Sequence, residues 1–182
     1  MDSASPSATA RPTPPEKPAL VRVLEQNPDF CCAQLRNIAA LVWNYPPTLH
    51  AFERSAAAMR PLLDEHPAGV GILTVLRSGD SSEESALVRQ ANARRIKDSG
   101  GAIAAVATVD GRNDLFGTIN RLPLRLRFPL ARGVRERYFG RTGDACAWLA
   151  DVLCEKGKPA PGAEELASSV DWLLDFYPGP AT

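Results

Sequence analysis

Three serines in one short polar loop, Ser78, Ser81 and Ser82, are the first residues of this sequence that could carry chemistry. The loop follows an apolar run and precedes Glu83 and Glu84, so one serine is well placed to begin a helix. A phosphate on Ser81 or Ser82 would add about −1.5 to −2 charges there, and the two glutamates would oppose it. The loop is therefore a candidate phosphorylation site. The alternative, which we favour, is that one serine is only the N-cap of the helix.

A run of arginines is the second candidate site. Residues 121–141 hold seven of the 17 arginines and only one acidic residue, Glu136, which gives a local charge of about +6. Such a patch is typical of a surface that binds an acidic protein, a phosphate-bearing ligand or nucleic acid. The alternative is a solvated strand and loop whose arginines pair with acids elsewhere. The seven residues are Arg121, Arg125, Arg127, Arg132, Arg135, Arg137 and Arg141.

The remaining chemistry-bearing residues argue against an enzyme. The two histidines, His50 and His66, stand at opposite ends of one expected helix, roughly 24 Å apart, so they cannot share a metal ion. Hydrolase, zinc-protease and nucleotide-binding motifs are missing from the sequence. We expect no catalytic residue, no metal and no cofactor. Asp110 follows an apolar strand, where α/β proteins place ligands, so a small enzyme or ligand-binding domain that uses loops 78–82 and 110–114 is the competing interpretation.

The four cysteines are expected to be buried, reduced thiols. Cys31 and Cys32 are neighbours on an expected strand, so their side chains point to opposite faces. Cys146 and Cys154 are eight positions apart and belong to no metal-binding motif. Packing is therefore the simplest role for these residues.

The overall composition is that of a soluble globular chain. Its 182 residues contain 21 basic and 21 acidic side chains, a length that suits one domain with tails. No apolar run approaches the roughly 18 residues of a membrane span, and the first ten residues lack a signal-peptide pattern. We expect a cytoplasmic chain with a protein partner and without nucleic acid or membrane as a partner. A homo-oligomer is left open.

Hydrophobic periodicity and turn residues predict an α/β domain. The predicted elements, in chain order, are strands 30–35 and 38–43, a helix over 48–65, a strand over 70–76, a helix over 81–98, a strand over 102–109, a helix over 113–122, a strand over 135–139 and a helix over 142–154. The first two strands form a hairpin, and the later strands alternate with helices, so they pair in parallel through right-handed crossovers. The order ββαβαβαβα, followed by a C-terminal helix, predicts a mixed, mostly parallel sheet flanked by helices.

Both ends of the chain differ in composition from this domain, which spans 29–155. Residues 1–28 contain six prolines and are expected to be a disordered tail. Residues 156–182 begin as a Gly/Pro-rich linker and continue as an amphipathic helix over 163–176. That helix either packs back on its own domain or docks into a groove of a partner. Its candidate docking residues are Leu166, Val170, Trp172, Leu173 and Phe176.

The predicted order and three local segments resemble the SpoIIAA-like and STAS superfamily of small α/β domains. The matching segments are 42–48 (VWNYPPT), 69–75 (GVGILTV) and 137–149 (RYFGRTGDACAWL). The resemblance covers about residues 29–154, and most of the matching residues occupy core positions, which specify a fold more than a chemistry.

The resemblance implies a non-enzymatic regulatory or protein-interaction module. In the anti-sigma-factor antagonists of this superfamily, a partner kinase phosphorylates a serine at the start of the second helix and so controls the release of a partner protein. The corresponding region here is 78–85. Asp80 and Ser81 match the family's Asp-Ser-x-Gly pattern, and Glu83 stands in place of its glycine. A structural subunit of a protein assembly, joined by the tail and the terminal helix, is a further alternative.

Overall fold

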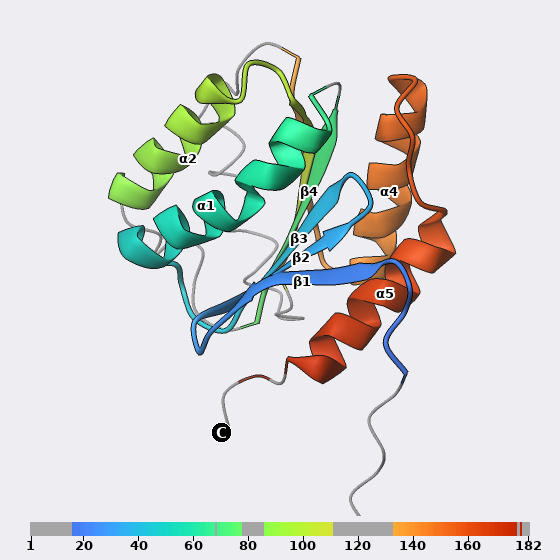
Figure 1. Ribbon diagram of the computed structural model, residues 1–182, viewed down its shortest axis with the longest axis horizontal. Coiled ribbons are helices and arrows are strands. Elements are labelled where there is room, and N and C mark those ends of the chain that lie inside the picture. Colours follow the sequence, from blue (N-terminus) through green and yellow to red (C-terminus); the bar gives the residue numbers. More distant parts are fainter. Residues whose placement is uncertain (1–15, 68, 78–85, 111–132, 178, 180–182) are drawn as a thin grey trace, which may run out of the picture.

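A computed structural model describes residues 16–67, 69–77, 86–110, 133–177 and 179 of the chain (Figure 1). The elements are β1 (Val21–Gln26), β2 (Phe30–Leu35), β3 (Ile38–Trp43), α1 (Leu49–Glu65), β4 (Val70–Leu76), α2 (Ala86–Asp98), β5 (Ile103–Asp110), β6 (Arg135–Phe139), α4 (Thr142–Glu155) and α5 (Ala163–Phe176). The expected helix over 113–122 lies outside the described residues.

The six strands form one mixed sheet in the order β1-β2-β3-β4-β5-β6. The first three pair antiparallel, and β3 to β6 pair in parallel, which confirms the predicted α/β class. The expected hairpin is present: Leu35 pairs with Ile38, and Arg36 in the turn between them has a φ of 55°. The predicted strand over 135–139 is present as the short, charged β6, which lies at one edge of the described sheet.

The tail prediction is wrong for residues 21–26, which form the edge strand β1. None of the six prolines falls inside this segment, so every residue in it can donate to a strand ladder. Val21 is buried against β2, and Glu25 forms an ion pair with Arg54 of α1. Local burial and pairing therefore outweigh the tail-like composition of the surrounding sequence. Residues 1–15 lie outside the described residues.

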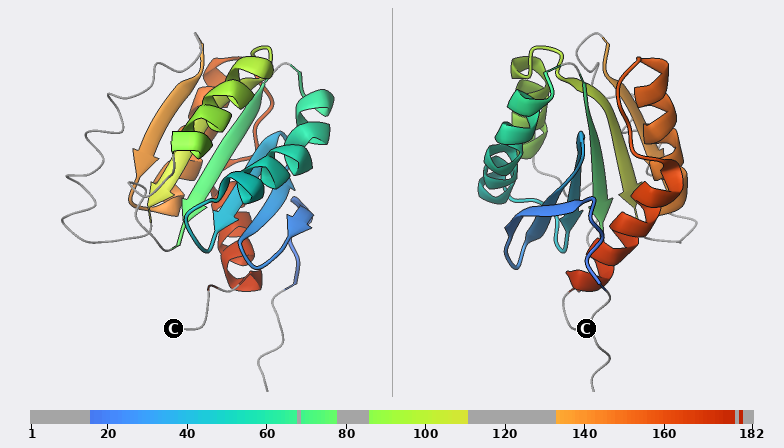
Figure 2. Two further views of the ribbon diagram at one scale, coloured as in Figure 1. Left: turned by 90° about the vertical axis from the view of Figure 1, so that its left-hand side faces the viewer. Right: turned by 45° about the vertical axis from the view of Figure 1, so that its right-hand side comes forward.

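Helices cover both faces of the sheet, as Figure 2 shows. One face carries α1 and α2, and the other carries α4 and α5. Two separate hydrophobic clusters result, and β2 contributes to both: Cys31 belongs to the cluster under α4 and α5, and Cys32 to the one under α1. The predicted opposite orientation of these two thiols is confirmed. Strand β4 is buried over most of its length, which is expected for a strand covered on both faces.

The C-terminal helix belongs to the domain. Leu166, Val170 and Leu173 of α5 are fully buried in the same cluster as Cys31. The docking interpretation is therefore wrong for these three residues. The physical reason is that α4 lies over β4 to β6, so the β1 end of this face would be open to water without α5.

A candidate interaction groove between α1 and α2

The candidate phosphorylation site lies outside the described residues. These are the serines Ser78, Ser81 and Ser82, and their proposed role stays a prediction. The same holds for four of the seven clustered arginines, Arg121, Arg125, Arg127 and Arg132.

The three described arginines of the cluster lie on or next to β6. Arg135 forms an ion pair with Glu155 of α4, and the guanidinium carbon of Arg137 lies 5.2 Å from the centroid of the Phe139 ring. Arg141 precedes α4 and makes no side-chain capping bond. Because side chains alternate along a strand, Arg135 and Arg137 point toward α4, on the opposite side from Glu136.

The aromatic end of α5 is partly exposed. The rings of Trp172 and Phe176 stack with their centroids 4.7 Å apart, and 43% of Phe176 is exposed. Within the predicted docking set, Phe176 is thus exposed and Trp172 is partly buried against the core, whereas the other three residues lie in the core. Neither residue lines either of the two clefts described below.

His50 and His66 stand at the two ends of α1, as the sequence predicted. Among the described residues there is no group of three or more His, Cys, Asp or Glu side chains that could hold a metal ion. The described part also contains no helix that is long and apolar enough to cross a membrane.

A groove of about 710 Å³ lies between α1 and α2. We call it the α1–α2 groove. Small and apolar side chains occupy much of its lining, and charged side chains form its rims. The residues are Phe52, Glu53, Ala56, Ala57, Arg60, Leu63, Asp64 and Pro67 on the α1 side, and Ala91, Arg94, Arg95, Asp98, Ser99, Gly100 and Ala102 on the α2 side.

Helix α2 is a polar helix that touches the core at few points, which is why the groove exists. Only Val88 and Ile96 of its 13 residues are buried. The guanidinium carbon of Arg95 lies 4.8 Å from the centroid of the Phe52 ring, so a cation–π contact joins α2 to α1 where an apolar side chain would pack more closely. Leu87, at the start of α2, is 58% exposed.

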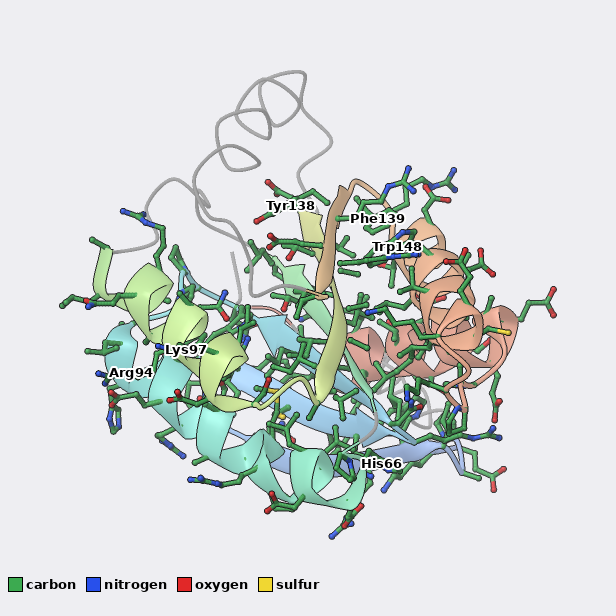
Figure 3. All side chains as sticks on the ribbon, turned by 90° about the horizontal axis from the view of Figure 1, so that it is seen from above. His66, Arg94, Lys97, Tyr138, Phe139 and Trp148 are labelled. Carbon is green, nitrogen blue, oxygen red and sulfur yellow. The ribbon has the colours of Figure 1, made fainter. Side chains whose placement is uncertain are left out.

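The rims of the groove repeat one charge pattern on both helices. Arg60 precedes Asp64 by four residues on α1, and Arg94 precedes Asp98 by four residues on α2. All four side chains are exposed, and within the described part of the chain none of them forms an ion pair or a side-chain hydrogen bond. Figure 3 shows Arg94 at the outer surface, between α2 and α1.

A second, smaller cleft of about 90 Å³ lies between α2 and the carboxyl halves of the parallel strands. Thr74, Thr108 and Tyr138 bring three hydroxyl groups to it, and Glu136 brings a carboxyl group. Tyr138 donates a hydrogen bond to Glu136 (3.2 Å). Loss of hydration nevertheless raises the pKa of the Glu136 carboxyl group above its ordinary value, and the bond from Tyr138 offsets only part of that effect.

Figure 3 shows Tyr138 and Phe139 on opposite sides of β6, with Phe139 beside Trp148. The acidic, hydroxyl-lined side of β6 therefore faces the small cleft, and its arginine side faces α4. Asp110, which the sequence singled out, is buried at the end of β5.

The sequence alone did not point to the α1–α2 groove. Its apolar residues have the spacing of an ordinary amphipathic helix, and its charges resemble those of any solvated helix face. A repeat was nevertheless present: both helices carry Arg followed four residues later by Asp, near their C-terminal ends. No known protein family, curated protein or solved structure matches this chain.

Proposed function

We propose that this chain is a protein-interaction module that docks a partner protein in the α1–α2 groove. The observation that carries the proposal is an open groove whose apolar lining is bordered by Arg60, Asp64, Arg94 and Asp98, exposed charges that form no ion pair among the described residues. Apolar lining gives a partner area to bury, and charged rims give it orientation.

The shape of the groove favours a protein over a small molecule. Helix α1 has 17 residues, which corresponds to a length of roughly 25 Å, and the α1 side of the groove runs from Phe52 to Pro67. Small-molecule sites instead enclose most of the surface of their ligand. An elongated groove between two helices matches the way in which many domains receive a helical segment.

The regulatory role of such a module is a finer part of the same proposal. It rests on the resemblance to SpoIIAA-like and STAS domains in residues 29–154, together with a hairpin followed by strands that alternate with helices. A regulator of this kind acts by binding and releasing a protein, which is the activity that the groove would supply.

Site-specific photo-crosslinking in cells tests the proposal. A photoreactive amino acid replaces Ala57, which is exposed on the α1 side of the groove, or Ser168, which is exposed on α5 as the matched control. We expect a covalent adduct with a specific protein from position 57 and none from position 168. Equal adducts from both positions, or none from position 57, would contradict the proposal.

Binding of a small ligand in the smaller cleft, between α2 and strands β4 to β6, is the second candidate function. The observation that favours it is the Glu136 carboxyl group, whose pKa is raised by desolvation and which lines the cleft with three hydroxyl-bearing residues at the carboxyl ends of parallel strands. Native mass spectrometry of the purified chain tests it. A bound metabolite that is lost in Glu136→Gln and retained in the control Glu155→Gln would support this candidate. A chain with no retained molecule would argue against it.

A further inference from the structure

We infer that the segment received by the α1–α2 groove is an amphipathic helix that presents an acidic and a basic side chain one helical turn apart. This inference rests on the proposed function, because it concerns the partner of the same groove. It adds the chemistry by which that partner would be recognised.

The direction of the two groove helices follows from the strands that they connect. Helix α1 connects β3 to β4, and α2 connects β4 to β5, and these three strands are parallel. Both helices therefore run in the same direction across the sheet. The order Arg then Asp consequently has the same direction on both rims.

The spacing of the arginine and the aspartate on each rim matches one turn of a helix. Four residues of an α-helix span about 6 Å, so the positive and negative charges on each rim lie about one turn apart. A helix in the groove has side chains four residues apart on one face at the same spacing. On each rim, an acidic side chain of the partner can therefore face the arginine, Arg60 or Arg94, while a basic side chain one turn along faces the aspartate, Asp64 or Asp98.

Small and apolar side chains line the floor of the groove. Ala56, Ala57 and Ala91 are small, so the backbone of a third helix can approach closely, and Leu63 and Pro67 add apolar surface. An apolar stripe on the partner helix would cover these residues. The occupant is thus amphipathic, with its two charges flanking its apolar stripe.

The other charges of the groove, Glu53 and Arg95, are not part of the repeated rim pattern. Glu53 lies near the opposite end of the α1 rim, and no acidic residue of the α2 lining accompanies it. Arg95 is half-buried and lies over Phe52, so it belongs to the floor more than to the rim. The doubled charges are therefore those of Arg60 with Arg94 and of Asp64 with Asp98.

A displayed library of helical peptides of about 15 residues is the probe for this inference. Peptides are selected on the purified full-length chain and counter-selected on an Ala91→Trp variant, in which a large side chain fills the groove. Circular dichroism and thermal unfolding check that the variant folds. We expect the groove-dependent binders to be enriched in an acidic and a basic residue three or four positions apart.

Charge reversal provides the second arm. The variant Arg60→Glu, Arg94→Glu, Asp64→Arg, Asp98→Arg changes only exposed side chains, so the fold should persist. Binding of the selected peptides should fall about tenfold or more, because four favourable contacts become repulsive. Exchange of the acid and the base in a peptide should restore its binding to this variant.

The outcomes separate the inference from the proposal on which it rests. Groove-dependent binders without the charge pair, or binders that tolerate the reversal, would overturn the inference and leave a docking groove in place. The absence of any groove-dependent binder would overturn both. A wild-type chain that dimerises in sedimentation equilibrium, and becomes monomeric as Ala91→Trp, would also overturn the inference, because a second copy would then be the occupant.

Discussion

A hydroxyl group on Tyr177 connects the C-terminal helix to the turn between the first two strands. Its oxygen lies 2.7 Å from the carbonyl oxygen of Asn27 and 3.0 Å from that of Pro28. The hydroxyl has one hydrogen, so it donates to one carbonyl at a time or is shared between them. Arg77 supports the same junction, because it donates to the carbonyl of Leu174 and its guanidinium carbon lies 5.7 Å from the centroid of the Tyr177 ring.

Replacement of Tyr177 by Phe should lower the free energy of unfolding by about 1 kcal/mol, the net value of one intramolecular hydrogen bond. Urea denaturation measures the change. Tyr45→Phe is the matched control, because 47% of Tyr45 is exposed and its loss should cost less than about 0.5 kcal/mol. Equal effects for the two variants would show that the bond at Tyr177 contributes nothing.

The buried thiols make stability depend on pH in the alkaline range. Burial raises the pKa of Cys31 from 9.0 to about 11, and those of Cys32 and Cys146 from 9.0 to about 12. The folded chain therefore keeps protons that the unfolded chain releases above pH 9. The stabilisation is complete below pH 9 and is lost as the pH rises toward 11 and 12, by at most about 1.4 kcal/mol per thiol and pH unit.

Urea midpoints at about pH 8 and about pH 10 test this dependence. We expect a lower midpoint at the higher pH. The loss should be smaller in Cys32→Ala and unchanged in Cys154→Ser, because Cys154 is exposed. A midpoint that does not change with pH would show that the three thiols are accessible to water in the folded state.

Helix α5 packs on the sheet at the C-terminal end of the domain, and substitutions in α5 test this packing. Leu173 is fully buried, so Leu173→Ala should lower the free energy of unfolding by about 2–5 kcal/mol. Ser168→Ala, on the exposed side of the same helix, should change it by less than about 0.5 kcal/mol. Thermal and chemical denaturation measure both. A Leu173→Ala variant as stable as the wild type would mean that α5 does not pack on the sheet in solution.

Local sequence signals predicted most elements, because the residues that end a helix or strand lie within it or directly beside it. Proline ends β3, and Thr48 caps α1 by accepting a hydrogen bond from the backbone N–H of Ala51 (3.2 Å). Strand β1 was missed because pairing with β2, a non-local effect, gives it its structure. The role of α5 was left open because an apolar stripe does not reveal which apolar surface will cover it.

The α1–α2 groove could not be predicted for a related reason. Its lining residues come from two helices that are separated by β4 in the chain, and only their packing brings them together. Exposed charges such as Arg60 and Asp98 carry no signal of their own, because most solvated helix faces contain the same residue types. The sequence did not predict the smaller cleft between α2 and β4 to β6 either, because it pointed to the loops 78–82 and 110–114, and Asp110 is not among the residues that line this cleft.

For the whole molecule, the two faces of the sheet are packed differently. Helix α4 buries five of its 14 residues, whereas α2 buries two of its 13. The α2 side is therefore held by fewer apolar contacts, and few buried contacts favour local opening. A face of this kind can adjust to a partner at low cost.

Hydrogen exchange should reveal this difference in the isolated chain. We expect backbone amides in the middle of α2 to exchange at least about tenfold faster than those in the middle of α4. Exchange measured by NMR or mass spectrometry on the same sample provides the comparison, with β4 as the protected reference. Equal protection of the two helices would contradict the unequal packing.

We propose that this chain binds a protein in the α1–α2 groove. The most direct measurement is the crosslinking yield from a photoreactive residue at position 57, compared in cells between the otherwise unchanged chain and one that also carries Ala91→Trp. We predict a specific protein adduct that disappears when the tryptophan fills the groove, while the fold and the amount of the chain stay the same. An adduct that persists undiminished in the Ala91→Trp background would contradict the claim.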